Sequence, residues 1–395
     1  MKPVEFLLLH DNPNAGALLA SILGSDVSIE VSSWADSWDR VMQTALHKKG
    51  PDLAVIGSTW TPDLVGMNAL RTFTQNEISM LGTPRAFLPS IWRTAYHSDP
   101  NTISSIPWLC GSYVIYYWRD MLEKAGIDEK TAFSTPVQLK DTLQRLQAHG
   151  NPSPWSAPTK YKYAHLNSLV SWIWGMEGDL LSTDGKRLLF DQPQALTAIR
   201  EYFHLYQYLH PSLRLGTDQY GPNLFLKREV AATIGVTAWL SEIKNKVGID
   251  PAQGNNLGVA LPPGPAYVGG NSLAIFNYTQ QPENAFKVIQ ALLDPDMQKQ
   301  LNENPMFGYL PVLSNLFDQH PFDNDPHYQV LAQAVKTGRS YPNERLWGMI
   351  EKRLGQSLFN IEAQLLNNPD TNLETLVYPE IQALANRLRM TLDLQ

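Results

Sequence analysis

The chain has 395 residues, a length that fits two or more domains and excludes a small disulfide-stapled module. Apolar residues make up 43% of the sequence and charged residues 17%, which excludes a largely disordered protein. The net charge of −7 lacks the basic excess of nucleic-acid-binding proteins, so we expect no nucleic-acid partner.

The single cysteine, Cys110, excludes an intramolecular disulfide and a cysteine metal cluster. No apolar run approaches the roughly 18 residues of a membrane-spanning helix. The apolar run from Phe6 to Leu9 is too short for the core of a signal peptide. A periplasmic or extracellular location would therefore require an export signal that has been removed from the front of this sequence. Without such a signal we expect a cytoplasmic location.

The first 57 residues predict an alternation of strands and helices. Short apolar runs at 4–9, 27–31 and 53–56 favour buried strands. The segments between them, 15–23 and 36–49, have the spacing of helices, and the second carries an apolar stripe that includes Trp38, which we predict to be a core residue. This β-α-β-α-β order is typical of a parallel sheet covered on both faces.

Polar and aromatic residues follow each of these predicted strands. Asp11 and Asn12 come after the first strand, Trp34 after the second, and Thr59 and Trp60 after the third. Ligands of parallel sheets bind beyond the carboxyl ends of the strands. A single tryptophan there can simply pack beneath a loop, but the repetition at equivalent points favours a binding site.

The rest of the chain predicts more helix than strand. Predicted helices cover 118–125, 137–149, 165–176, 194–209, 282–293 and most of the chain from 343 onward. Predicted strands cover 230–236, 257–261 and 273–276, and residues 308–311 predict a loop.

Compact catalytic motifs are missing from the sequence. There is no nucleophile elbow, phosphate-binding loop, dinucleotide fingerprint or zinc-binding helix motif. The nine histidines are dispersed, and none forms a metal-binding pair one helical turn apart. Acidic residues such as Asp11, Glu177 and Asp179 could form a glycosidase pair, but any chain with 38 acids supplies such candidates. We therefore predict no catalytic residue, no metal site and no cofactor.

Several motifs occur in a characteristic order. Gly50-Pro51-Asp52 precedes the third strand, and residues 107–128 contain Tyr-Tyr-Trp-Arg-Asp-Met-Leu-Glu-Lys-Ala-Gly. Residues 225–235 read Phe-Leu-Lys-Arg-Glu-Val-Ala-Ala-Thr-Ile-Gly, and 269–275 and 308–311 follow. Together they resemble the extracellular solute-binding proteins of ABC importers, in the carbohydrate-type family that includes maltose-binding protein.

This resemblance implies a fold of the periplasmic-binding-protein type, an α/β architecture with two α/β lobes around a ligand cleft and several hinge crossovers. Lobe one would comprise 1–106 and 258–312, and lobe two 107–257 and 313–395. The resemblance also implies a non-catalytic, monomeric protein that binds a sugar, oligosaccharide or sugar derivative as the lobes close. It would deliver this ligand to the membrane permease of an ABC importer.

The resemblance also assigns ligand contacts by position. These contacts are Trp108, Gly111, Trp239, Gly270, Asn271 and Tyr341. Trp174, in a turn that resembles a family motif, is either a ligand contact or a core residue. Gly111 occupies a position where the family often has a sugar-binding Asp, so one strong acceptor for adjacent hydroxyls is missing. Gly269 and Gly270 form either a turn or a point where the backbone approaches a ligand.

Two other functions remain open from the sequence. The first is a carbohydrate-acting enzyme on the same scaffold, which would need two converging carboxylates and measurable turnover. The second is a ligand-sensing domain, which an absent export signal would favour. The tryptophan-rich strand ends suit a carbohydrate, because indole rings pack on the apolar faces of a sugar while polar side chains bind its hydroxyls.

Overall fold

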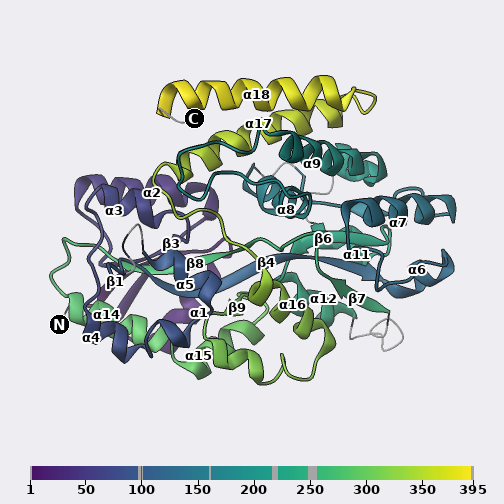
Figure 1. Cartoon of the computed structure of the whole chain (residues 1–395). Helices are drawn as coiled ribbons and strands as arrows, with labels where there is room; N and C mark the ends of the chain where they lie inside the picture. The colour runs from purple at the N-terminus through teal and green to yellow at the C-terminus, as the bar shows by residue number, and fades with distance from the viewer. Residues whose placement is uncertain are drawn as a thin grey trace. The chain divides into compact units, whose positions relative to one another are not determined.

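The computed structural model describes residues 2–96, 99, 101–159, 162–215, 221–247 and 256–392 (Figure 1). The chain divides into two compact units. Unit 1 comprises Met1–Gly111, Val268–Asp325 and Asn343–Gly348, and unit 2 comprises Ser112–Tyr267, Pro326–Pro342 and Met349–Gln395. The lobe boundaries expected from the sequence stay a prediction.

Unit 1 contains the predicted parallel sheet. Strand β1 (Val4–Leu9) lies between β2 (Val27–Ser32) and β3 (Leu53–Gly57) and is parallel to both. Helices α1 (Asn14–Leu23) and α2 (Trp34–His47) connect the three strands, so the predicted β-α-β-α-β order is confirmed. All five residues of β3 are buried, as expected for a strand covered on both faces.

The sheet of unit 1 continues on the other side of β3. Strand β8 (Val268–Ile275) pairs with β3 in antiparallel fashion and is followed in the strand order by β4 (Ile106–Trp118). The short strand β9 (Leu310–Pro311) pairs with Leu109 and Cys110 of β4. The prediction of a loop throughout 308–311 was wrong, because two buried residues are too few to leave a strand pattern in the sequence.

Seven α-helices and three 3₁₀ turns can be placed in the described part of unit 1. Besides α1 and α2 they are α3 (Thr61–Gly66), α4 (Gln75–Met80), α5 (Pro89–Trp92), α14 (Pro282–Leu292), α15 (Pro295–Glu303), η1 (Pro84–Ala86), η2 (Arg93–Ala95) and η4 (Ser314–Asp318). Several of them start with Pro at the first or second position, where the missing N–H costs no hydrogen bond.

Unit 2 has a smaller sheet built on the second half of β4. Strands β6 (Ala232–Val236) and β7 (Leu257–Ala260) pair with β4 in antiparallel fashion, and β5 (Trp155–Ser156) is parallel to β6. The helices that belong to or enter this unit are α6 (Arg119–Lys124), α7 (Pro136–Ala148), α8 (Lys162–Gly175), α9 (Pro193–His204), η3 (Leu205–Tyr208), α10 (Pro211–Leu215), α11 (Gly221–Leu226), α12 (Trp239–Val247), α16 (Pro326–Thr337), α17 (Trp347–Asn367) and α18 (Leu373–Leu392).

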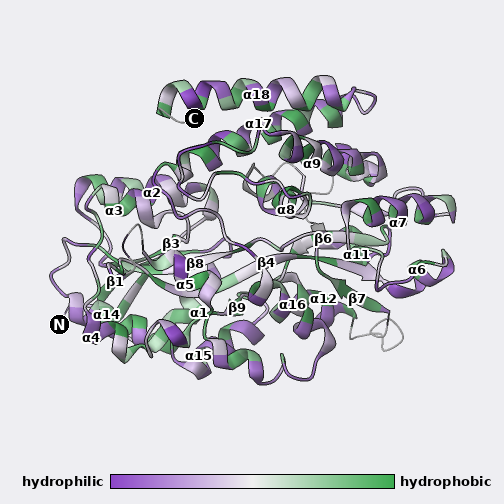
Figure 2. Cartoon of the chain, in the orientation of Figure 1, coloured by the Kyte–Doolittle hydropathy of each residue, from purple (hydrophilic) through white to green (hydrophobic). Residues whose placement is uncertain are grey.

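Apolar packing and one buried polar network hold the helices of unit 2 together. Helix α18 alternates hydrophilic and hydrophobic residues along its length (Figure 2), and its apolar face, which includes Ile381 and Leu384, is buried. Deeper in the unit, Glu362 of α17 lies with its Oε1 2.7 Å from His165 Nε2 of α8 and accepts a hydrogen bond of 2.9 Å from the Tyr206 hydroxyl of η3. His165 and Glu362 are 0% and 1% exposed, so this network lies wholly inside the unit.

No helix of the described residues combines the length and the apolarity needed to span a bilayer.

The pairing of β8 with β4 depends on Gly270. A Cβ atom at this position would lie 2.3 Å from the carbonyl oxygen of Leu109 and 2.9 Å from Cys110 Cα. Both are backbone atoms, which cannot rotate away as a flexible side chain could. The close approach that Gly270 permits is therefore an approach between two strands.

We predict that Gly270→Ala lowers the free energy of unfolding by about 1–3 kcal/mol, because the added methyl group overpacks the strand pair. Chemical denaturation with matched slopes would measure this loss. Gly66→Ala is the control, since a Cβ at Gly66 meets only Arg345 Nε, at 3.7 Å. Equal stabilities of the two variants would contradict the prediction.

Candidate functional site

The loops that follow β1 and β2 are joined by one hydrogen bond. The backbone N–H of Trp34 donates to Asp11 Oδ1 at 2.9 Å. In the parallel register Leu9 pairs with Ser32, so the two strands end side by side and their loops leave the sheet together. The predicted meeting of residues from the strand ends is thus seen for Asp11 and Trp34. Asp11 is exposed, and its second carboxylate oxygen accepts no hydrogen bond among the described residues.

The loop after β3 adds a second indole ring to this group. The Trp60 ring contacts that of Trp34 edge-on, with centroids 6.1 Å apart, and that of Trp38 edge-on at 5.1 Å. It also covers Gly57, where a Cβ would lie 2.9 Å from Trp60 Cε2. Trp38 is only partly buried, so its prediction as a core residue was wrong: its position in the helix stripe turns it toward Trp60. We call Trp34, Trp38 and Trp60 the indole cluster.

Polar side chains lie around the same strand ends. Asn271 of β8 is paired with Gly57 of β3 and is 6% exposed, and its side-chain amide makes no hydrogen bond within the described residues. Thr59 is partly exposed, and Asn12 is exposed. The Asn12 backbone N–H donates to His10 Nδ1 at 2.9 Å, which fixes the start of the loop after β1.

His10 and Tyr309 form the inner side of this region. His10 Nε2 is 3.1 Å from the carbonyl oxygen of Met306, so the imidazole donates there while Nδ1 accepts from Asn12. Burial lowers the pKa of His10, which favours this neutral form. Burial, followed by the negative charge of Asp11, raises the pKa of Tyr309 to about 12, so its hydroxyl stays a hydrogen-bond donor.

Unit 2 contains a separate group of stacked aromatic rings. The rings of Tyr267 and Tyr341 are 4.5 Å apart at 34°, and those of Tyr341 and Trp174 are 6.3 Å apart at 55°. The Tyr341 hydroxyl donates to Asn167 Oδ1 at 2.7 Å. The predicted residues Trp174 and Tyr341 therefore lie together, but both are buried, with exposed fractions of 6% and 4%.

A partly exposed ion pair contacts the Trp174 end of this stack. Asp179 Oδ1 accepts a hydrogen bond of 3.2 Å from Trp174 Nε1, and its Oδ2 lies 2.8 Å from Arg339 Nη2. The Arg339 guanidinium in turn lies over the Trp174 ring, 4.7 Å from its centroid. Asp179 thus orients an aromatic side chain, and no catalytic partner carboxylate has to be invoked for it.

Trp239 occupies a different place in unit 2. At the start of α12, it packs on Gly235 of β6, where a Cβ would lie 1.9 Å from Trp239 Cζ3. Its ring is 6.4 Å from that of Tyr116, whose hydroxyl donates to the Val236 carbonyl at 2.9 Å. Trp239 is partly exposed, so a ligand can reach one part of its ring.

The remaining predicted contacts lie in or beside β4. Trp108 is 1% exposed and packs against Phe307, and its buried Nε1 has no hydrogen-bond partner among the described residues. Gly111 is partly exposed and is the last residue of the first segment of unit 1. Cys110 is fully buried, and burial raises the pKa of its thiol, as is typical of an inert structural cysteine.

Tyr309, Tyr267 and Asn167 are not among the site residues predicted from the sequence. Each is a single residue in a loop or a helix without a repeated pattern, so periodicity gives no signal for it. The one available signal was the position of Tyr267, an aromatic residue just before the Gly269-Gly270 segment.

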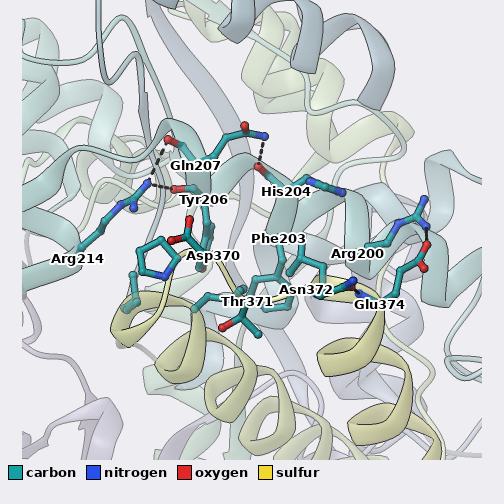
Figure 3. A pocket seen from close by; sticks show the side chains of 14 residues that line it. Arg200, Phe203, His204, Tyr206, Gln207, Arg214, Asp370, Thr371, Asn372 and Glu374 are labelled. Atoms are coloured by element: carbon teal, nitrogen blue, oxygen red, sulfur yellow. Dashed lines mark hydrogen bonds and ion pairs between the residues drawn. The ribbon is translucent and has the colours of Figure 1, made fainter.

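A cavity of about 710 Å³ lies in unit 2 between α9, η3 and the connection from α17 to α18 (Figure 3). None of the predicted site residues lines it. Its arginines are engaged: Arg200 pairs with Glu374 at 2.8 Å, and Arg214 donates to the carbonyl oxygens of Tyr206 and Gln207. We assign no ligand to this cavity.

Among the described residues, no group of three or more His, Cys, Asp or Glu side chains is arranged to hold a metal ion.

Residues 22–330 match the family of bacterial extracellular solute-binding proteins. The chain belongs to this family. The resemblance seen in the ordered motifs is thereby confirmed over most of the chain.

Two relatives illustrate how similar this chain is to known proteins. The sn-glycerol-3-phosphate-binding periplasmic protein UgpB of Brucella abortus is 26% identical over 270 residues, which are 62% of this chain and 59% of that protein. This chain therefore matches about three fifths of the length of that relative. A probable ABC transporter-binding protein of Deinococcus radiodurans is 23% identical over 377 residues, 85% of each chain.

Solved structures share the fold over nearly the whole chain. A solute-binding protein of Thermotoga lettingae with bound α-D-tagatose has a TM-score of 0.79 at 20% identity and covers 99% of both chains. The sugar-binding protein MalE of Xanthomonas citri has a TM-score of 0.79 at 18% identity and full coverage of both chains. UgpB of Mycobacterium tuberculosis with glycerophosphocholine has a TM-score of 0.75 at 14% identity, with 100% of this chain and 99% of that one covered. The predicted periplasmic-binding-protein type of fold is therefore confirmed.

We predict that His10 makes this family member sensitive to mild acid. Because the folded-state pKa of His10 is lowered, the unfolded state binds its proton more readily, and stability falls as the pH drops through the ordinary histidine value of about 6.5 toward the folded-state pKa. His10→Gln should flatten this part of the stability curve. Urea titrations between about pH 7.5 and 5 would measure the slope, with His47→Gln on the exposed part of α2 as the control. Equal slopes for the wild type and His10→Gln would contradict the prediction.

Proposed function

We propose that this protein is the ligand-binding component of an ABC importer, that it binds a sugar, oligosaccharide or sugar derivative, and that it delivers this ligand unchanged to a membrane permease. The observation that supports this most directly is the indole cluster at the carboxyl ends of β1 to β3, beside Asp11 and Asn271. Membership of the extracellular solute-binding family supports the transport role.

The chemistry of this region suits a polyhydroxylated ligand. Indole rings offer flat apolar surfaces to the C–H faces of a sugar. The free oxygen of Asp11 can accept a hydrogen bond from a hydroxyl, and the unpaired amide of Asn271 can both donate and accept. The Asn271 side chain is 6% exposed, so its amide group is held in place by the surrounding structure where a ligand hydroxyl can reach it.

The ligand class has two candidates that share these hydroxyl groups. Structural neighbours carry tagatose or bear the name of a sugar-binding protein, and curated relatives are named for glycerol 3-phosphate. A free sugar and a glycerol phosphate differ in their negative charge. We favour the uncharged sugar, because the hydrogen bond from Trp34 holds the carboxylate of Asp11 beside the indole cluster, and this carboxylate would repel a phosphate.

We expect a saccharide to raise the thermal unfolding midpoint of the purified protein. A ligand that binds only the folded state at a hundredfold excess over its dissociation constant adds about 2.7 kcal/mol of stability. The panel should contain mono-, di- and oligosaccharides, D-mannitol, sn-glycerol 3-phosphate, glycerophosphocholine, amino acids and short peptides. Mass spectrometry of the ligand after incubation should find it unchanged. Product formation would instead favour an enzyme, and silence across the panel would contradict the proposal.

We predict that Trp239→Ala weakens the binding of the saccharide found in this panel by at least about fivefold, or ~1 kcal/mol, because a partly exposed aromatic contact is lost. Isothermal titration calorimetry would measure the change. Tyr378→Ala on α18 of the same unit serves as the control, since it removes a partly exposed ring far along the chain from every predicted contact. An unchanged affinity in a folded Trp239→Ala protein would remove this residue from the site.

A further inference from the structure

The aromatic stack of unit 2 has one accessible ring. Trp174 and Tyr341 are 6% and 4% exposed, whereas Tyr267 is partly exposed. Tyr267 therefore forms the outer end of the stack, above Tyr341 at 4.5 Å. This distance is typical of offset-stacked aromatic rings, so Tyr341 covers one face of Tyr267 from within unit 2.

Hydrogen bonds and an ion pair hold the two rings that lie under Tyr267. Tyr341 is held by its hydrogen bond to Asn167, and Trp174 by the Asp179–Arg339 pair. The backbone holds the outer ring to the same frame, because the Arg339 N–H donates to the Ala266 carbonyl at 2.8 Å and Arg339 forms a parallel β-bridge with Tyr267. A ring on such a support loses little conformational entropy when a ligand packs on it.

The hydroxyl group of Tyr267 is also available. It makes no hydrogen bond among the described residues, whereas the hydroxyl of Tyr341 beneath it is paired. Burial, and after it the negative charge of Glu351, holds the pKa of Tyr267 well above its usual value. The hydroxyl therefore remains protonated at neutral pH and can donate to a ligand oxygen.

We infer that Tyr267 is a ligand-binding residue of unit 2, which packs its ring on an apolar face of the sugar and donates its hydroxyl to a ligand oxygen. This inference rests on the proposed function and names a contact that the sequence did not indicate. In this arrangement Trp174 and Tyr341 are positioning residues: they support Tyr267 and do not themselves touch the ligand.

Calorimetry with maltose, D-mannitol and sn-glycerol 3-phosphate as probes tests the inference. For whichever probe binds the wild type most tightly, Tyr267→Ala should weaken binding by at least about tenfold, as expected for a central aromatic contact. Tyr267→Phe keeps the ring and should lose about threefold to tenfold through the missing hydrogen bond. Tyr378→Ala should bind as the wild type does.

A second measurement uses the wild type alone, so it does not depend on the folding of a variant. The bound probe should protect Tyr267 from hydroxyl-radical oxidation, as mapped by peptide mass spectrometry, and should leave Tyr378 unprotected. Wild-type affinity in folded Tyr267→Ala, or oxidation of Tyr267 at an unchanged rate with the probe bound, would overturn the inference while the proposed function stands. If maltose, D-mannitol and sn-glycerol 3-phosphate all fail to bind the wild type, the proposed function is contradicted for these three ligand classes. The inference about Tyr267 is then rejected together with it.

Discussion

The parallel pairing of β1 with β2 and β3 is the constraint on which the candidate site of unit 1 depends. Because the three strands run in the same direction and in register, their carboxyl ends lie at one edge of the sheet. Three loops that are far apart in the sequence then have to leave the sheet together. The hydrogen bond from Trp34 to Asp11 and the edge-on contact of Trp34 with Trp60 follow from this geometry. Position 57 favours glycine, because a Cβ atom there would lie 2.9 Å from the ring of Trp60.

Unit 2 builds its aromatic surface in another way. Its rings come from segments that are distant in the sequence, and they are aligned by hydrogen bonds and one ion pair, not by the ends of parallel strands. Only the outer ring of the stack is accessible, so most of the tryptophan and tyrosine here serves as support. Aromatic content by itself is therefore a poor guide to which rings meet a ligand in this protein.

The sequence was informative where a pattern repeats. The continuous apolar runs predict β1, β2 and β3 to within one residue, and the order of these strands predicts that Asp11, Trp34 and Trp60 lie at the same edge of the sheet. The sequence was uninformative where a contact depends on a single residue. Trp108 and Trp239 look alike as isolated tryptophans, yet one is 1% exposed and the other is partly exposed, since only tertiary packing decides between them. Tyr267 was not predicted as a ligand contact for the same reason. Position 270 needs glycine because the neighbouring strand β4 lies too close for a Cβ atom, and the local sequence does not reveal this strand.

The buried network of His165, Glu362 and Tyr206 has a consequence for motion. It joins α8, α17 and η3 at a point that is closed to bulk solvent. Sliding one of these helices past another would leave a polar group without its partner in the interior, which typically costs about 1–3 kcal/mol. Helices α8 and α17 and the turn η3 are thus expected to move together, and slow amide hydrogen exchange in α8 and α17 would be the signature. Trp174 of the aromatic stack and Asn167, the partner of Tyr341, both lie on α8, so the stack is expected to move with this group of helices.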